Sequence, residues 1–491
     1  MVESISDEKA DDPHGSESHS SEVVHEGEDA AFGDTTHDSV STEDLNTIRY
    51  VNPSMSAAEI TSVIEEVSDA GGGMVIAEAG EYDPEAPIEM SDGVYFRGAS
   101  KAGTVFRPTE GLEAVEGADF GRSVFHAEDV EDIEFSHMSI DGTTDLNADY
   151  CIEPFDCENI SIHDIFATNV ADDPIVIHRN SENFGVYFCE TAGEFDTEQF
   201  GSNGIEVEEG ARDGFVAFNH CFDREMGIEV KSRDPGRETR NVWVFGNYIS
   251  GSESGGIALS GDDDGDETLW LESVHVFHNI IEDIGADGTG VAFRPREFVR
   301  NSTIENNIIR GCDHAVRAGW LGDVDNLSIN ANEMHDIDGD VIKLEGGAVY
   351  DVADNKFISG GDGFRIGIRL ESSGVEAICE ENKIYDTNIS QAIRVDGGRV
   401  DARYNYYPED NAEITDDADE GNILIGNQFD GINVADGKVD VVRGNIPTVP
   451  VNITQLDEFE GNWAYNDGTT GSEGYSYYDG ADWVGVDTTA L

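Results

Sequence analysis

One short pattern of apolar and polar positions recurs along most of the chain. Each copy alternates apolar and polar residues and ends in an asparagine followed by an apolar residue, as in VAFNHCF, VWVFGNYI and VHVFHNII. The asparagines are Asn219, Asn247, Asn279, Asn307, Asn332, Asn355, Asn382, Asn405 and Asn427. They follow one another at intervals of 22 to 32 residues. A repeat of this length that contains only short strands indicates a solenoid.

A second apolar alternation, of the type GIEV or GIRL, accompanies these copies. It occurs at 204–207, 227–230, 256–259, 290–293, 341–344, 367–370, 392–395 and 431–434. Strands this short and this close together leave no room for crossover helices, so they can only stack on their equivalents in successive coils. An asparagine at the same corner of every coil can bond the backbone that a tight bend leaves unpaired. The sequence therefore predicts an all-β fold, a parallel β-helix.

A helix is predicted before the first coils. Residues 56–70 carry apolar positions at helical spacing, and Ser56 and Glu59 fit a capping box. Glycines at 71–73 end the helix, and the strand segments MVIAEAGEY and GVYFRGAS follow. The helix, these strands and the asparagine corners resemble the pectate-lyase-like β-helices and viral tailspikes over roughly residues 50–450. The resemblance implies a right-handed parallel β-helix whose open first coil is covered by the helix.

The patterns divide the chain into four parts. Residues 1–48 are polar and acidic without a period, which is typical of a flexible arm. Residues 49–120 are predicted to form the cap and the first coils, and residues 121–450 the β-helix. Residues 451–491 are aromatic and glycine-rich, and the segment YYDGADWVGVDT resembles the tip modules of tailed-virus fibres. A β-hairpin that caps the stack is the alternative for this last part.

Charge limits the partners of the chain. It has 104 acidic and 28 basic residues, a formal net charge of −76, and only 7 lysines against 21 arginines. This composition resembles that of proteins from extremely halophilic archaea, because at molar salt the Debye length falls to about 3 Å and screens most self-repulsion. The negative charge argues against nucleic acid and anionic membranes as partners.

No membrane-spanning or export segment is expected. No run of about 18 apolar residues occurs, so we predict no membrane insertion. The segment MVESISDEKADDPHGSESHSS has neither a basic n-region nor an apolar h-region, and it carries no twin arginine. We therefore expect that the chain is not exported by a recognisable signal.

A series of basic side chains is predicted on the outer face of one strand per coil. The predicted outward residues are His178, Lys231, Arg294, Arg317, Lys343, Arg369 and Arg394, with Arg233 and Arg296 beside them. Because coils stack about 4.8 Å apart, they are predicted to form one column. Such a column suits an acidic glycan, and Trp243, also outward, is a candidate for stacking on a sugar ring. A ladder of ion pairs with neighbouring acids is the structural alternative.

Two acidic motifs are candidates for catalysis. NADYCI at 147–152 and ADDPIVI at 171–177 resemble the N-T-D and G-D-D strand motifs of polygalacturonase-type glycosidases. One coil apart, they bring Asp149 near Asp172 and Asp173, and the resemblance implies the acid and base of glycoside hydrolysis. The G-H-G motif of that family is absent. A lyase would instead use Lys231 or Arg233 as its base, beside acids that bind Ca²⁺.

One loop offers oxygen ligands for a cation. In GDDDGDE at 261–267, the side chains of Asp262, Asp264 and Asp266 could hold Ca²⁺ or another cation, although the EF-hand register is absent. A solvated acidic loop is the alternative. No other cofactor is indicated.

These observations favour a spike or fibre protein of a tailed virus that infects a halophilic archaeon. In this hypothesis the protein resides in the virion, binds acidic glycans of the host surface, and contacts other virion proteins through its N-terminal arm. The resemblance to tailspikes implies a homo-oligomer, with a trimer favoured. A polysaccharide lyase or glycoside hydrolase, secreted or at the cell surface, is the first alternative. A purely structural virion or surface protein is the second.

The charge generates a test of the halophile hypothesis. Lowering the salt from about 3 M to about 0.1 M KCl lengthens the Debye length to about 10 Å and unscreens the acidic surface. We expect the melting temperature to fall, or the protein to unfold, when circular dichroism follows melting at both concentrations. A melting temperature that stays the same at both would contradict the hypothesis.

Overall fold

The structure of the chain is a computed structural model. It describes residues 47–112, 122–142, 147–193, 203–263, 268–285, 290–347, 349–360, 365–385, 389–415, 417–434 and 438–443, and three later strands. The predicted acidic arm at 1–48 lies outside the described residues except for its last two. Asp264 and Asp266 of the predicted cation loop also lie outside them.

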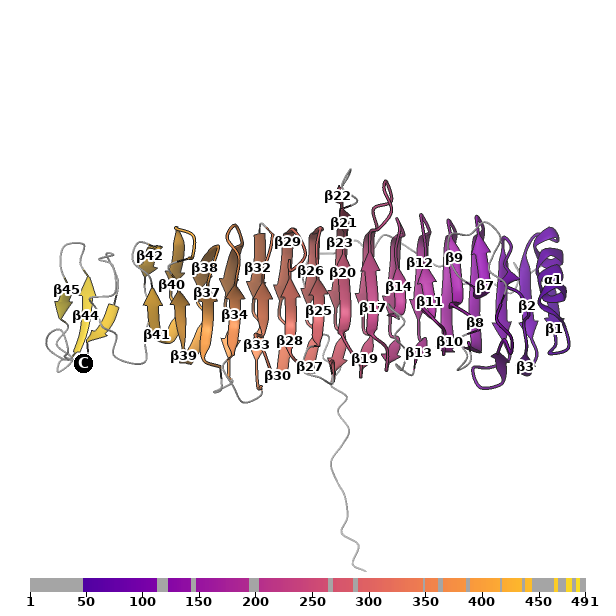
Figure 1. The fold of residues 1–491 in the computed structure, drawn as a ribbon, viewed down its shortest axis with the longest axis horizontal. Coiled ribbons are helices and arrows are strands. Elements are labelled where there is room, and N and C mark those ends of the chain that lie inside the picture. Colours follow the sequence, from indigo (N-terminus) through magenta and orange to yellow (C-terminus); the bar gives the residue numbers. More distant parts are fainter. Residues whose placement is uncertain are drawn as a thin grey trace, which may run out of the picture. The chain divides into compact units, whose positions relative to one another are not determined.

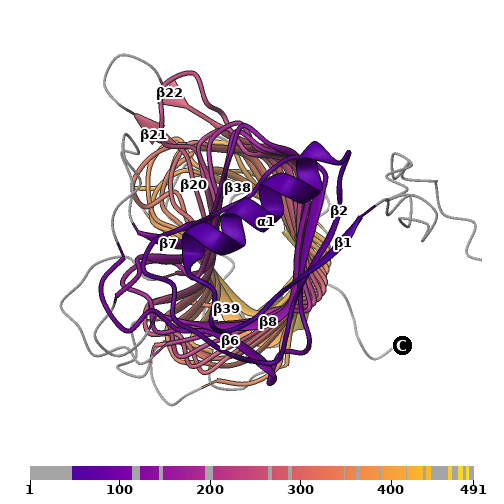
Figure 2. The same ribbon diagram turned by 90° about the vertical axis from the view of Figure 1, so that its right-hand side faces the viewer.

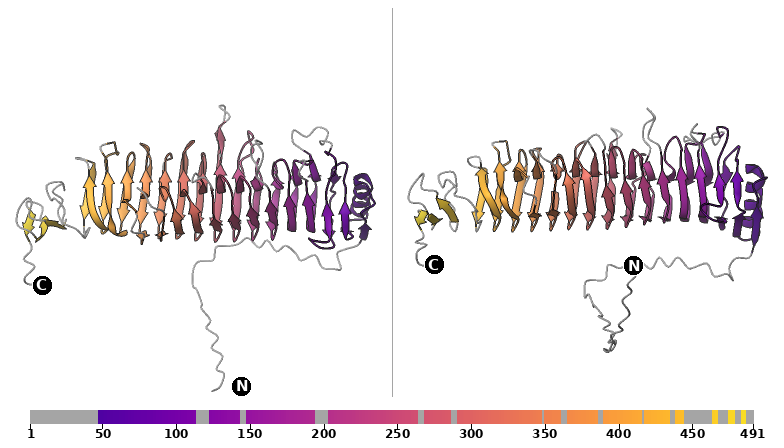
Figure 3. Two further views of the ribbon diagram at one scale, coloured as in Figure 1. Left: turned by 60° about the horizontal axis from the view of Figure 1, so that its bottom comes forward. Right: turned by 90° about the horizontal axis from the view of Figure 1, so that it is seen from below.

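The described chain folds as a right-handed parallel β-helix of about 12 turns. Strands of successive coils lie side by side and pair in parallel (Figure 1 and Figure 3). Each coil has three faces, and the chain bends between them. This confirms the fold class that the repeats predict.

The first face carries the GIEV-type strands. They are β4 (Ile88–Glu89), β7 (Ser123–Glu128), β9 (Tyr150–Phe155), β11 (Ile175–Ile177), β14 (Asn203–Val207), β17 (Met226–Lys231), β20 (Gly255–Ser260), β25 (Val291–Pro295), β28 (His314–Ala318), β31 (Ile342–Leu344), β34 (Ile366–Leu370), β37 (Gln391–Val395) and the end of β39 (Tyr406–Ile414).

The second face carries the strands that precede the asparagines. They are β1 (Ile48–Val51), β2 (Gly73–Ala77), β5 (Val94–Gly98), β8 (Glu131–Asp141), β10 (Glu158–Thr168), β12 (Glu182–Tyr187), β15 (Arg212–Ala217), β18 (Arg240–Phe245), β23 (Leu271–Phe277), β26 (Val299–Glu305), β29 (Val324–Asn330), β32 (Val349–Ala353), β35 (Glu376–Glu380), β38 (Arg399–Arg403), β40 (Asn422–Ile425) and β42 (Val439–Arg443).

The third face follows the asparagine corner, and β8, β10 and β39 continue across corners. Its other strands are β3 (Gly80–Tyr82), β6 (Thr104–Phe106), β13 (Glu190–Ala192), β16 (His220–Phe222), β19 (Tyr248–Ser250), β24 (Ile280–Glu282), β27 (Ile308–Cys312), β30 (Glu333–Ile337), β33 (Lys356–Phe357), β36 (Lys383–Ile384) and β41 (Gln428–Val434). Outside the coils, β21 (Asp262–Asp263) pairs with β22 (Thr268–Leu269) as a hairpin, and β43 (Trp463–Asn466), β44 (Gly474–Tyr478) and β45 (Trp483–Gly485) form an antiparallel sheet.

The helix α1 (Ala57–Asp69) lies across the end of the stack (Figure 2). Ser56 and Glu59 form the predicted capping box, in which each side chain bonds the other residue's backbone N–H. The helix buries Ile60, Ile64 and Val67. Its apolar stripe therefore joins the core that the first coil would otherwise expose to water. No described helix is both long and apolar enough to cross a membrane.

The core is a stack of aligned apolar side chains. On the first face, Ile205 pairs with Ile228, Ile228 with Ile257, and Ile257 with Phe293. These four side chains are at most 1% exposed. Because alternate residues of a strand point to opposite sides, this register turns the residues between them away from the core.

The asparagine corner is a continuous hydrogen-bonded ladder from Asn219 to Asn427. In each step, the backbone N–H and the amide Nδ2 of one asparagine donate to Oδ1 of the next, for example from Asn279 to Asn307 at 2.9 and 3.0 Å. The same Nδ2 donates to a carbonyl of the previous coil, as from Asn279 to Val244 at 2.9 Å. The ladder confirms the predicted role of these residues.

The ladder generates a stability prediction. Replacing Asn307 by alanine removes its hydrogen bonds to Asn279, Asn332 and Val276 in a buried corner. We expect the free energy of unfolding to fall by about 3 kcal/mol, since each buried polar group left unpaired costs about 1–3 kcal/mol. Chemical denaturation in high salt measures this loss. Asn180→Ala is the matched control: Asn180 is exposed and bonds only Asp156 among the described residues, so a loss under about 0.5 kcal/mol is expected.

Candidate functional site

The predicted basic column is split by the register of the first face. Arg317, Lys343, Arg369 and Arg394 align directly from coil to coil. Arg294 aligns with Ala258 and through it with Glu229. Lys231 instead aligns with Ser260. Val176 aligns with Glu206, and Glu206 with Glu229, so His178 and Lys231 each lie two residues beyond the row of Arg294. Lys231 and His178 therefore lie in a neighbouring row, so the prediction of a single column is wrong. Alternation fixes which side a residue faces, but it does not fix register between coils.

The C-terminal part of the first face is a ladder of ion pairs. Its contacts are Arg317–Glu345 at 2.5 Å, Lys343–Glu345 at 2.9 Å, Lys343–Glu371 at 2.7 Å, Arg369–Glu371 at 3.4 Å, Arg369–Asp396 at 2.9 Å and Arg394–Asp396 at 2.7 Å. Glu345, Glu371 and Asp396 each lie two residues after the base of their own coil. Each of these acids also contacts the base of the preceding coil. In this part the geometry favours the structural alternative, because these bases already have carboxylate partners.

A buried charged cluster occupies the N-terminal part of the same face. The Lys231 ammonium contacts Glu206, lies 3.0 Å from Glu208 and 3.9 Å from Glu229. The three carboxylates point away from the core, yet they are at most 6% exposed. Burial alone would lower the pKa of Lys231, but the surrounding carboxylates outweigh it and raise the pKa well above its usual value. Lys231 therefore stays charged and holds the cluster together.

His178 extends this cluster toward the N-terminal coils. Its ring lies 2.9 Å from Glu208 and 3.5 Å from Glu153, and it stacks on Phe155 at a centroid distance of 4.6 Å. Burial opposes ionisation of Glu208, but its bonds to His178 and Lys231 outweigh burial and lower its pKa. The same bond to Glu208 raises the pKa of His178 against the effect of burial. The ionised form of Glu208 is thus favoured by its contacts with His178 and Lys231.

The three predicted catalytic acids lie together on adjacent coils. The backbone N–H of Asp172 donates to the carbonyl of Asp149 at 3.1 Å, and the Asp149 carboxylate binds Arg122 at 2.8 Å. Burial raises the pKa of Asp172 to about 6, although the Tyr150 hydroxyl donates to it at 3.1 Å. Burial also raises the pKa of Asp173, which is 2% exposed and accepts the Asn203 backbone N–H. Asp149 and Asp172 are both partly exposed and can be reached by a ligand, whereas Asp173 is buried.

Several residues of this site were not predicted. Glu153, Glu206 and Glu208 share the buried cluster, and Arg224 donates to the Asp172 carbonyl at 2.9 Å while only 3% exposed. The outward position in GIEV gave a usable signal for Glu206, since the same position in the next coil is Glu229. No pattern in the sequence indicates that Arg224 enters the site.

A second, cationic group of side chains lies near the cluster; it consists of Arg294, Arg317, Ser254 and Trp320 and is named the Arg294 site. The Arg294 guanidinium donates to Ser254 at 3.1 Å and lies 5.1 Å from the Trp320 ring, and Arg317 lies 4.4 Å from the same ring. Among the described residues Arg294 makes no ion pair, whereas Arg296 binds Glu229 at 3.1 Å. Burial and the neighbouring Arg296 lower the pKa of Arg294 to about 10, so it remains a cation at neutral pH.

The two parts are connected through Asn203. Its backbone N–H binds Asp173, and its Nδ2 donates to Glu229 at 3.1 Å. Glu229 in turn binds Arg296 at 3.1 Å, and Arg296 lies two residues after Arg294. Through these contacts, Asp173 and the Lys231 cluster form a polar network that reaches the segment carrying Arg294.

The remaining predicted residues lie apart from this network or at its edge. Trp243 is on β18 of the second face, where it pairs with Phe215 and stacks on His275 at 6.1 Å. Trp243 is thus on another face than the basic residues, because the asparagine repeat and the GIEV repeat form different faces, and its role in stacking on a sugar ring stays a prediction. Arg233 is exposed and has no ion pair within the described chain. Asp262 lies on β21 of the hairpin outside the coils, and its partners in the predicted cation loop fall outside the described residues.

No family model matches the chain, and no curated protein is similar to it. Among solved structures, the A-module of the Azotobacter vinelandii mannuronan C-5 epimerase AlgE6 matches with a TM-score of 0.48 and 14% identity, over 80% of this chain and 95% of the other. The Streptococcus pneumoniae surface adhesin PfbA matches at 0.49 and 11%, over 88% and 96%. A tailspike of E. coli bacteriophage HK620 matches at 0.48 and 11%, over 79% and 77%. At these identities such likenesses carry no inference about activity.

The buried cluster generates a mutational prediction. Lys231→Met removes the cation that neutralises Glu206, Glu208 and Glu229, so we expect the free energy of unfolding to fall by about 3–5 kcal/mol. The control is Arg399→Met, which breaks an exposed pair with Glu376 at 2.8 Å and should cost about 0–1 kcal/mol. Denaturant titration of both variants in the same high salt measures the difference. Equal losses would show that Lys231 is not a buried counter-ion.

Proposed function

We propose that this protein binds an acidic polysaccharide along its first face, with the Arg294 site binding a carboxylate or sulfate group of the glycan. The observation that carries the proposal is the unpaired state of Arg294 among the described residues. In a chain with 104 acids and 28 bases, carboxylates are available almost everywhere. A half-buried guanidinium that none of them neutralises is suited to an external anion.

The neighbours of Arg294 support the same ligand. Lys231, Arg296, Arg317, Lys343, Arg369 and Arg394 all have carboxylate partners. Arg294 is therefore the base within the strands of this row that makes no ion pair in the described chain, whereas Arg233, which makes none either, follows β17 and is exposed to solvent. The Trp320 ring beside it presents an apolar, polarisable surface of the kind on which sugar rings pack.

Cleavage of the bound glycan is the second candidate function, and Asp172 favours it. A partly exposed carboxyl with a pKa of about 6 keeps a large share of its proton near neutral pH, as a general acid requires. Asp149, held by Arg122 on the previous coil, is the candidate base for a hydrolytic reaction. Asp173 is too buried to touch a substrate and is a positioning residue in this scheme.

The proposed setting is the particle of a virus of a halophilic archaeon, outside the cell at the moment of attachment. The net charge of −76 and the few lysines support a high-salt environment. The resemblance of the C-terminal segment to fibre tips supports a role in attachment, with the arm at 1–48 as the link to other virion proteins. A trimer is the proposed assembly, by resemblance to tailspikes.

The binding proposal is tested with sulfated and uronic-acid polysaccharides from haloarchaeal envelopes, in high salt. Arg294→Gln removes the cation and keeps most of the side-chain volume, so affinity should fall by a factor of at least about ten, equivalent to one lost charged hydrogen bond. Arg399→Gln, an exposed arginine of the second face, is the matched control and should bind normally. If both variants bind as the unmodified protein does, Arg294 does not bind the glycan.

Cleavage is tested on the same polysaccharides by the release of new chain ends. Asp172→Asn should leave binding intact and abolish cleavage, because the amide cannot donate the carboxyl proton. For the unmodified protein, activity should decline as the pH rises through about 6, since the protonated form is lost above the pKa of Asp172. Binding without any chain cleavage would identify a purely binding protein.

A further inference from the structure

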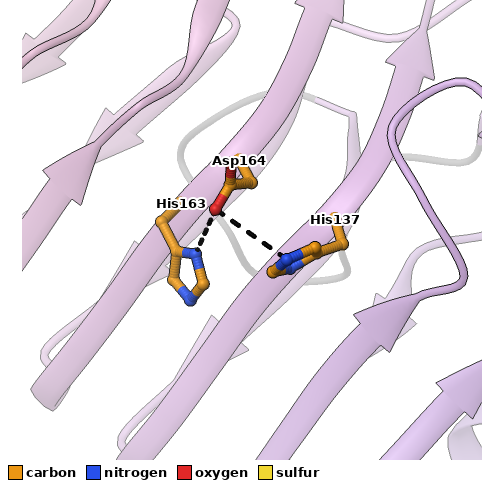
Figure 4. Close-up of side chains that lie close together, drawn as sticks. All are labelled: His137, His163 and Asp164. Carbon is orange, nitrogen blue, oxygen red and sulfur yellow. Dashed lines mark hydrogen bonds and ion pairs between the residues drawn. The ribbon is translucent and has the colours of Figure 1, made fainter.

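A histidine-rich cluster lies on another part of the molecule, at the corner between the second and third faces. It consists of His137 on β8 with His163 and Asp164 on β10 (Figure 4). Ser136 pairs with His163 and Met138 with Ile165, so His137 and Asp164 occupy equivalent corner positions on adjacent coils. Both have a left-handed backbone, with φ of 59° and 53°. The corner bend thus turns both side chains toward one another.

The three side chains converge on one point. Each offers one ligand atom, and these atoms all lie within 4.8 Å of one another. Asp164 Oδ2 lies 2.9 Å from His163 Nδ1 and 3.9 Å from His137 Nε2 (Figure 4). The two imidazole rings are nearly perpendicular, at 84°, with centroids 5.5 Å apart. The nitrogens and the carboxylate oxygen therefore surround a common space instead of stacking.

We propose that His137, His163 and Asp164 bind a divalent transition-metal ion of the Zn²⁺ class and thereby clip β8 to β10. Two imidazole nitrogens and one carboxylate oxygen are a common ligand set for such ions, with water completing the coordination. Ca²⁺ and Mg²⁺ prefer oxygen ligands and are disfavoured here.

The surroundings of His163 fit a metal ligand. Its second nitrogen, Nε2, lies 3.3 Å from Glu134 Oε1, and Glu134 also accepts the Ser136 hydroxyl at 2.8 Å. The ring stacks on Tyr187 at 4.8 Å. A carboxylate on the far nitrogen fixes the tautomer and orients the near nitrogen of a coordinating histidine. Glu134 is placed for this role.

The His137 side chain makes no hydrogen bond within the described chain. Its Nδ1 atom is buried without a partner, and its Nε2 lies 3.9 Å from Asp164 Oδ2, beyond hydrogen-bond distance. Buried polar atoms normally have a partner. A metal ion held between Nε2 and Asp164 would give this ring a polar partner.

A second group with suitable spacing, His178 with Glu208 and Glu209, is a poorer metal site. The Lys231 ammonium lies 3.0 Å from Glu208, and the Arg237 guanidinium lies 3.6 Å from Glu209. Both carboxylates thus already have cationic partners. The corner at His137 has no such cation bonded to its carboxylate among the described residues.

The test uses the full chain, stripped of metal by a chelator and titrated with Co²⁺ and Zn²⁺ in high salt. The expected result is one site with a visible Co²⁺ ligand-field spectrum and a rise in melting temperature with Zn²⁺. His137→Gln should weaken binding by at least about tenfold, in line with the loss of one supporting group at a metal site. Because His137 makes no hydrogen bond among the described residues, this variant should fold normally by circular dichroism. His163→Ala and Asp164→Asn should act in the same direction.

Two controls separate the corner from other histidines. His335→Ala removes a ring that pairs with Glu333 at 2.8 Å elsewhere, and it should leave the Co²⁺ spectrum unchanged. Replacing the four arm histidines, His14, His19, His25 and His37, by alanine should also leave one site. If binding persists in His137→Gln and His163→Ala, or disappears with the arm variant alone, the proposal is overturned.

Discussion

In-register stacking of parallel coils is the constraint on which the rest of the structure depends. Successive coils lie about 4.8 Å apart, so each outward side chain has an equivalent directly above and below it. Stacking stabilises apolar side chains that point inward, because aligned residues such as Ile205, Ile228 and Ile257 bury one another's surface in the core. It also stabilises asparagines, because each can donate to the next. Like charges are not stabilised by it, and a chain with 104 acids must solve this problem on every face.

The first face solves it in two different ways. In its C-terminal part, bases align with bases and acids with acids, but each acid lies beside two bases, so that Glu345 joins Arg317 and Lys343. In its N-terminal part, Glu206 and Glu229 are aligned on adjacent coils, and the single Lys231 ammonium pairs with both. Burial raises the pKa of both Glu206 and Asp173. In this part of the face, several carboxyl groups with raised pKa values lie close together, as a site for proton transfer requires.

How much the sequence could predict depends on whether the signal is local. The asparagine ladder and the capping box of Ser56 and Glu59 were predictable, because each rests on a repeated spacing or on residues three apart. The alignment of Lys231 with Ser260 instead of Arg294 depends on how many residues each coil inserts, which no local pattern encodes. The His137 corner was missed for a related reason. Its two histidines are far apart in sequence, and they meet only because the corner positions of β8 and β10 fall in register.

The same constraint explains why Arg294 is exceptional. Along its row, Glu229 is separated from it by Ala258, a residue without charge, and the next coil supplies Arg317. The carboxylate nearest in register is therefore two coils away and is already bound to Arg296. Arg317, Lys343 and Arg369 also align with bases, but each has an acid in the row two residues later, at Glu345, Glu371 or Asp396. For Arg294 that row holds Arg296 in its own coil and Gly319 in the next coil, so it supplies no carboxylate. Where the repeat does not neutralise its own charge, an external anion can, and the position of Arg294 follows from the register of the fold itself.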